Sequence, residues 1–216
     1  MKWLTAKWFK NNWLLVVANV GSVAPLVYLI WAYYTNNLTI NPIQEATFQT
    51  GKYALILLIL SLACTPIYTI FGWRQVLPLR KPLGLYGFMY VTVHFFIFIW
   101  WDYGLDWGLI YEATFEKRYA LVGFAAFVLL IPLAATSTKW AIKQLGRTWK
   151  QLHRLAYVAA VLGIVHYIWL VKADITEPLL WGAFLAILLG VRIPPVRKKI
   201  VSWRQGLRKR SQGAAA

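Results

Sequence analysis

The sequence predicts an all-α integral membrane protein, a bundle of six transmembrane helices with both the N- and C-termini in the cytoplasm. Three observations support this fold class. First, 60% of the 216 residues are hydrophobic, whereas a soluble domain has roughly 45–50%. Second, six apolar stretches are long enough to cross the hydrocarbon core, which takes about 20 helical residues. Third, the charged residues lie between these stretches and are separated by sign.

The six predicted spans follow one another with short connections. They cover residues 13–34, 53–71, 83–101, 119–135, 152–171 and 179–193. Pro25, Pro66 and Pro132 fall inside spans or near their ends, where membrane helices tolerate proline. We therefore predict a basic cytoplasmic N-terminus at residues 1–12, one membrane domain at 13–193 and a basic cytoplasmic tail at 194–216.

The distribution of charge predicts the orientation. All but four of the 23 basic residues lie on the side of the two termini; the exceptions are Lys52, Lys117, Arg118 and Lys172. All seven acidic residues lie on the opposite side. By the positive-inside rule, the basic side is cytoplasmic. The net charge of +16 thus reflects topology, and we expect contact with membrane lipid and no nucleic-acid partner. The tail either contacts anionic lipid or docks a cytosolic partner.

All three histidines, His94, His153 and His166, lie in predicted spans. An ionisable residue inside a membrane indicates function by default, although a neutral histidine can simply bond a neighbouring helix. At 1.5 Å per residue, His94 and His166 lie about 17 and 21 Å from the basic side, and His153 only about 2 Å. We therefore predict that His94 and His166 are the axial pair of a haem b that moves electrons across the bilayer.

A second haem beside His153 would need an unusual ligand, because no histidine lies at its depth. Arg80 and Lys81 face it from the start of the third span. Arg80 is therefore a candidate cofactor-binding residue, either for haem propionates or for a phosphate-bearing flavin, although plain positive-inside placement also explains it. The sequence leaves one or two haems open.

Several absences narrow the function. No Asp or Glu lies in the middle of a span, which argues against a proton-coupled transporter. There is no Gly-rich phosphate-binding motif and no Ser/His/Asp set. Electrons must therefore come from a partner protein or from a lipid-soluble quinol.

Motifs around the histidines resemble a known family. They are Thr50-Gly51-Lys52, Thr65-Pro66, Arg80, Leu83-Gly84-Leu85 with His94, Thr136-Ser137-Thr138, Leu145-Gly146, Leu152-His153, Tyr157 and His166-Tyr167. They resemble the MsrQ (YedZ) family, the haem-binding membrane subunits of bacterial periplasmic methionine-sulfoxide reductase systems. More distantly, they are similar to the ferric reductase and NADPH oxidase transmembrane domain.

The resemblance implies cofactors, partners and location. It implies b-type haem on His94, His153 and His166, an associated FMN whose contacts it does not assign, and a place in the bacterial inner membrane. Electrons would come from the quinone pool or a cytosolic flavin reductase. They would pass to a periplasmic molybdopterin enzyme, in which the reduction of methionine sulfoxide is expected to occur.

Two departures from the relatives qualify this implication. The oxidase relatives carry two histidines on the third span, and Arg80 stands where the inner one would fall. Their fused FAD/NADPH domain is also absent, so direct oxidation of NADPH is not expected. The alternatives are a stand-alone ferric or quinone reductase of the same fold and a haem-free membrane scaffold protein.

Overall fold

The computed structural model describes residues 6–171 and 174–213, and within these ranges the chain forms helices and turns with no β-strand. The α-helices are α1 (Ala6–Tyr34), α2 (Pro42–Phe71), α3 (Arg80–Phe96), α4 (Trp107–Phe115), α5 (Arg118–Ala135), α6 (Lys139–Leu152), α7 (Leu155–Leu170), α8 (Thr176–Arg192) and α9 (Pro194–Gly213). A 3₁₀ turn, η2 (Arg74–Leu79), precedes α3, and a π-helical turn, η3 (Ile97–Asp102), follows it. The predicted all-α class is confirmed.

The helices have the length and composition of membrane spans. Four segments qualify individually: Asn12–Tyr34, Pro42–Phe71, Arg74–Asp102 and Arg118–Ala135. Helices α7 and α8 have only 16 and 17 residues. They qualify when each is joined to its bent neighbour, α6 at 47° and α9 at 77°. Counted in this way, the described residues contain up to six spans, in agreement with the predicted number.

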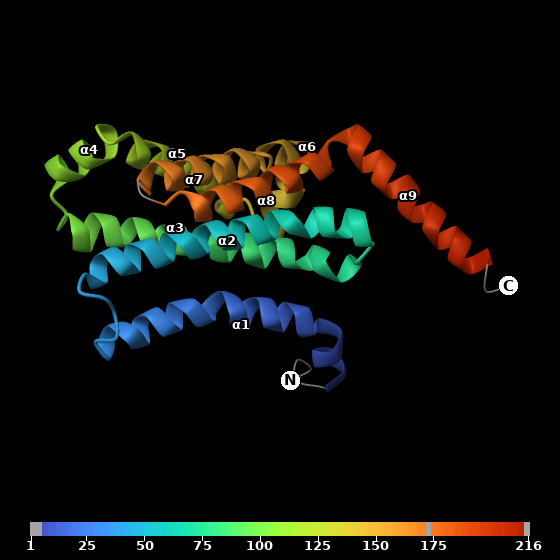
Figure 1. Cartoon of the computed structure of the whole chain (residues 1–216), viewed down its shortest axis with the longest axis horizontal. Coiled ribbons are helices and arrows are strands. Elements are labelled where there is room, and N and C mark those ends of the chain that lie inside the picture. The colour runs from blue at the N-terminus through green and yellow to red at the C-terminus, as the bar shows by residue number, and fades with distance from the viewer. Residues whose placement is uncertain (1–5, 172–173, 214–216) are drawn as a thin grey trace.

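The bundle has two chemically distinct ends. Helices α2, α3, α5, α7 and α8 run alongside one another, α1 lies on the side of α2 and α3, and α9 projects from the far end (Figure 1). We call the end with the start of α2, the end of α3 and α4 the acidic end, since it holds Glu45, Asp102 and Glu177. The end with α6 and α9 is the basic end. Helix α1 begins and α8 ends there (Figure 1).

Helix α2 is the centre of the packing. One buried cluster joins it to α5, α7 and α8 through Leu58, Ile59, Ala160 and Leu185, among others. A second cluster joins its opposite face to α3. In lipid, the hydrophobic effect does not drive helices to associate. Van der Waals packing and interhelical hydrogen bonds therefore hold the bundle together.

Helix α1 is attached to this centre by hydrogen bonds from α3. The Tyr86 hydroxyl donates to the Asn19 side chain over 2.9 Å. The Tyr90 hydroxyl, which is fully buried, donates to the Ser22 carbonyl over 2.8 Å. These two bonds fix the position of a helix whose other faces are largely exposed.

Two helices at the basic end were not expected from the sequence. Residues 139–152, read as a connection, form α6, which the Thr138 side chain caps by accepting from the Ala141 N–H. Gly146 breaks this helix with φ 50° and ψ −116°, a conformation that other residues rarely adopt. Residues 194–213, read as a tail, form α9 with Pro194 at its start. Hydropathy alone misses both because they are amphipathic or polar.

Arg192 supplies a hydrogen bond that a proline removes from α2. Pro66 has no N–H, so the Leu62 carbonyl four residues earlier lacks its helical partner. The Arg192 guanidinium donates to that carbonyl over 2.6 Å and to the Tyr157 hydroxyl over 2.7 Å. One side chain of α8 thus ties α2 to α7.

Replacing Arg192 by methionine is expected to lower the free energy of unfolding by about 2 kcal/mol, because a hydrogen bond from a charged donor contributes roughly 1.5–3 kcal/mol. Denaturant unfolding in detergent, followed by tryptophan fluorescence, measures this change. Arg197→Met is the matched control, since the Arg197 side chain is exposed and makes no hydrogen bond to another described residue. Equal stability of the two variants would contradict the role of Arg192.

Candidate functional site

Two histidines from different helices meet inside the bundle. His94 lies near the end of α3 and His166 near the end of α7. Their ring centres are 6.2 Å apart and their planes are inclined at 83°. A histidine nitrogen binds a first-row metal at about 2 Å, so two rings on opposite sides of one ion have centres about 6 Å apart. The observed spacing therefore suits two ligands of a single metal.

A backbone carbonyl fixes each ring. His94 Nδ1 lies 2.8 Å from the Thr47 carbonyl oxygen, and His166 Nδ1 lies 2.7 Å from that of Tyr119. A carbonyl only accepts, so both Nδ1 atoms must carry the proton and donate. Each Nε2 then keeps its lone pair, which is the tautomer that binds a metal, and the carbonyl is the usual second partner of a metal-bound histidine.

Glycine makes both hydrogen bonds possible. In a helix the Cβ atom tilts toward the N-terminus, so the side chain of residue i+4 lies over residue i. Gly51 is four residues after Thr47, and Gly123 is four residues after Tyr119. A Cβ on Gly51 would lie 3.1 Å from the His94 ring, and one on Gly123 would lie 2.6 Å from His166 Nδ1. A larger residue at position 51 or 123 would therefore block the histidine ring from reaching the Thr47 or Tyr119 carbonyl.

The two rings border a cavity of about 460 Å³ between α2, α3, α5 and α7. This volume is within the range of small-molecule sites, roughly 300–1,000 Å³. Toward the basic end its wall is apolar, with Leu55, Leu58, Phe127 and Leu130. Toward the acidic end it is polar, and the residues there include Asn41, Gln44, Lys52, Asp102, Tyr103 and Thr114.

The number of protein ligands limits the kind of metal group. Among the described residues, no cluster of three or more His, Cys, Asp or Glu side chains could hold an ion. Two histidines fill only two coordination positions of a first-row metal, so other donors must fill the rest. A group that brings its own planar set of nitrogens, as haem does, fits two imidazoles at this spacing beside a partly apolar cavity. The residues present therefore fit a haem.

The structure places the other two predicted site residues elsewhere. His153 is the C-cap of α6, and its ring stacks on that of Trp149 with centres 3.9 Å apart. Its Nε2 lies 3.1 Å from the Thr136 hydroxyl oxygen. Arg80 begins α3, and its Nε donates to the Leu77 carbonyl over 3.3 Å. Neither side chain lines the cavity, so His94 and His166 are brought together and His153 and Arg80 remain at the basic end.

The glycines were the part of the site that sequence reasoning missed. In the sequence, Gly51 stands out only as part of the motif Thr50-Gly51-Lys52, and Gly123 lies in none of the motifs around the histidines. One signal was present, since Gly51 precedes His94 by the same 43 residues by which Gly123 precedes His166. The equal spacing can be interpreted only when it is known that α2 packs against α3 and α5 against α7.

Comparison with known proteins places this site in a family. The family model described as ferric reductase like transmembrane component matches residues 50–164, which include both glycines and His94. This match defines the class as a ferric reductase-like membrane protein.

Similar proteins identify the family within this class. The chain is 42% identical over 182 residues to the protein-methionine-sulfoxide reductase heme-binding subunit MsrQ of Rhodospirillum rubrum, covering 83% of this chain and 88% of the relative. The MsrQ proteins of Bordetella pertussis and Xanthomonas axonopodis pv. citri are 37% and 39% identical, over 83% and 82% of this chain and 92% and 84% of theirs. The chain therefore belongs to the MsrQ family. No solved structure was found to match it.

Proposed function

We propose that this chain is the haem b subunit of a methionine-sulfoxide reductase system in the bacterial inner membrane, with His94 and His166 as axial ligands of one haem. The observation that carries the proposal is the pair of rings with centres 6.2 Å apart, each fixed by a carbonyl so that Nε2 is free for iron. The names of the MsrQ relatives, which are heme-binding subunits, support it.

A bound haem would supply one-electron chemistry, with iron alternating between the ferric and ferrous states. The chain's own residues orient the ligands, exclude water from the apolar half of the cavity and set the electrostatic environment of the site. Reduction of a sulfoxide to a thioether and water takes two electrons and two protons. We propose that the chain delivers these electrons singly and that a periplasmic molybdopterin-dependent partner subunit carries out the reduction.

The orientation follows the positive-inside rule, with the basic end in the cytoplasm. Residues 1–12 and 194–216 are then cytoplasmic, and the polar end of the cavity lies toward the periplasm. In this proposal α8 alone is the sixth span, and α9, bent by 77° from it, lies along the anionic inner leaflet. We propose that the electron donor is the quinone pool of the membrane or a cytosolic flavin reductase.

A second haem at His153 and the FMN rest on the resemblance alone, and no described residue is assigned to the flavin. The Thr136 hydroxyl already contacts His153 Nε2, so a ligand role for His153 would require this contact to break. A pyridine haemochrome assay on the purified chain, normalised to protein, separates one haem from two.

The test of the function is spectroscopic. A reduced-minus-oxidised visible spectrum of the purified protein is expected to show b-type bands, and candidate periplasmic reductases plus a sulfoxide substrate are expected to reoxidise the haem. Absence of b-type bands in protein from haem-replete cells would favour the scaffold alternative. Equally fast reoxidation by a ferric chelate or quinone without the reductase would favour the stand-alone reductase.

A further inference from the structure

The cavity beside His94 and His166 is polar at one end only, and this asymmetry bears on how a porphyrin enters it. Along α2 its lining runs from Gln44 at the acidic end to Leu58 toward the basic end, a distance of about 21 Å at 1.5 Å per residue. A porphyrin has an apolar edge and an edge with two propionate carboxylates. Carboxylates buried without partners are costly, so they must lie toward the acidic end.

A charge problem arises at that end. Asp102 lines the cavity itself, and Glu45 and Glu177 line an adjoining pocket of about 350 Å³. Two further carboxylates would be repelled unless a cation were close by. Among the described residues that line the cavity, Lys52 is the one lysine, and there is no arginine.

Lys52 lies where the two spaces meet. It lines both the cavity and the adjoining pocket, as do Phe48 and Tyr167. It is also the residue after Gly51, which faces the His94 ring. The Lys52 side chain therefore starts from the same turn of α2 that supports one of the two rings.

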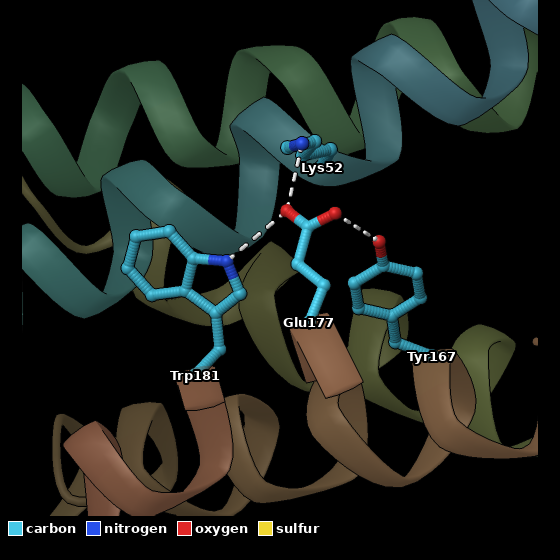
Figure 2. A network of polar contacts seen from close by, with 4 residues as sticks. All are labelled: Lys52, Tyr167, Glu177 and Trp181. Atoms are coloured by element: carbon cyan, nitrogen blue, oxygen red, sulfur yellow. Dashed lines mark hydrogen bonds and ion pairs between the residues drawn. The ribbon is translucent and has the colours of Figure 1, made fainter. Parts of the chain in front are cut away.

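Glu177 holds Lys52 in this position. Figure 2 shows the Glu177 carboxylate of α8 between Lys52 of α2, Tyr167 of α7 and Trp181. Lys52 Nζ lies 2.7 Å from Glu177 Oε1, Trp181 Nε1 donates to the same oxygen over 3.4 Å, and the Tyr167 hydroxyl donates to Oε2 over 3.1 Å. An ammonium group has three N–H donors, so the contact with Glu177 leaves donors of Lys52 for a second carboxylate.

We propose that Lys52 binds a propionate of the haem and so holds the porphyrin with its carboxylates toward the acidic end, with Glu177 as the positioning residue. This inference rests on the proposed haem function. Lys52 then bridges a protein carboxylate and a cofactor carboxylate, and no existing contact must break. The apolar edge of the porphyrin would then face the apolar part of the cavity wall, which includes Leu55, Leu58 and Phe127.

The test is a redox titration of the purified full-length haem protein carrying Lys52→Met, Lys52→Arg or Glu177→Gln, with resonance Raman spectra of the propionate vibrations. A cation near the haem favours the ferrous state, because reduction removes positive charge from the iron. Lys52→Met is expected to lower the midpoint potential and shift the propionate bands, and Lys52→Arg to restore both. Glu177→Gln is expected to raise the potential, since it removes a negative charge.

Lys117→Met is the matched control. Lys117 is also at the acidic end, and its Nζ donates to the Tyr103 hydroxyl over 3.2 Å, but it does not line the cavity. This variant is expected to leave the propionate bands unchanged.

The outcomes separate this inference from the proposed function. If the Lys52–Glu177 pair only clamps α2 to α8, Lys52→Met and Glu177→Gln will shift the potential in the same direction. That result, or unchanged propionate bands in Lys52→Met, would overturn the inference while the haem stays in place. Wild-type protein without b-type bands would overturn the proposed function and this inference with it.

Discussion

Replacing either His94 or His166 by alanine is expected to abolish the low-spin haem spectrum of the purified protein. Each variant removes one of two rings whose centres are 6.2 Å apart, and no other described histidine lines the cavity to take its place. Low-spin iron requires two strong axial ligands, so one remaining imidazole leaves at best a five-coordinate, high-spin haem. Optical and electron paramagnetic resonance spectra of the variants measure this change.

His153→Ala is the control for this experiment. His153 stacks on Trp149 at the basic end, away from the cavity, and its loss should leave at least part of the low-spin signal. Far-ultraviolet circular dichroism confirms that each variant stays folded. Equal loss from all three variants would contradict the pairing of His94 with His166.

Gly123→Ala is expected to impair haem binding nearly as much as loss of a ligand. The new Cβ would lie 2.6 Å from Nδ1 of His166, and the bond from that nitrogen to the Tyr119 carbonyl holds the ring in place. Overpacking of this kind costs about 1–3 kcal/mol, which corresponds to a roughly 5- to 150-fold weaker haem affinity. The ratio of haem to protein after purification, and the rate of haem transfer to apomyoglobin, measure it.

Two other glycines calibrate the effect. Gly51→Ala brings a Cβ to 3.1 Å from the His94 ring, so a smaller loss is expected. Gly190→Ala in α8 meets no atom within 4 Å and should leave haem content unchanged. The expected order of haem loss is therefore Gly123, then Gly51, then Gly190; similar behaviour of all three variants would show that the clearance over the rings is unimportant.

The membrane bundle was predictable because the bilayer imposes simple physics on the chain. Apolar runs of fixed minimum length identified the spans, and the separation of charge by sign distinguished the ends. The rise per residue of a helix was enough to place His94 and His166 at similar depth, and the structure brings their rings together. Their role as iron ligands stays a prediction for the spectra to test, as does any role of His153 and Arg80.

Features that depend on neighbours could not be read from one sequence. Helix α2 begins at Pro42, eleven residues before the predicted span, because the Asn41 side chain caps it by accepting from the Gln44 N–H. Hydropathy is insensitive to such a cap. The meaning of Gly51 and Gly123 depends on which helix packs against each, and the ion pair of Lys52 with Glu177 joins residues far apart in the chain.

The matched glycines have a consequence for the order of events during synthesis. Helices α2 and α3 supply one glycine, one carbonyl and one histidine, and α5 and α7 supply the same set. His166 follows His94 by 72 residues, so at about 5–20 residues per second the ribosome adds the second ligand seconds after the first. On the proposed ligation, a nascent or truncated chain that ends before α7 has one ligand only. Two-ligand haem binding would then occur only after both helix pairs, α2 with α3 and α5 with α7, have entered the membrane.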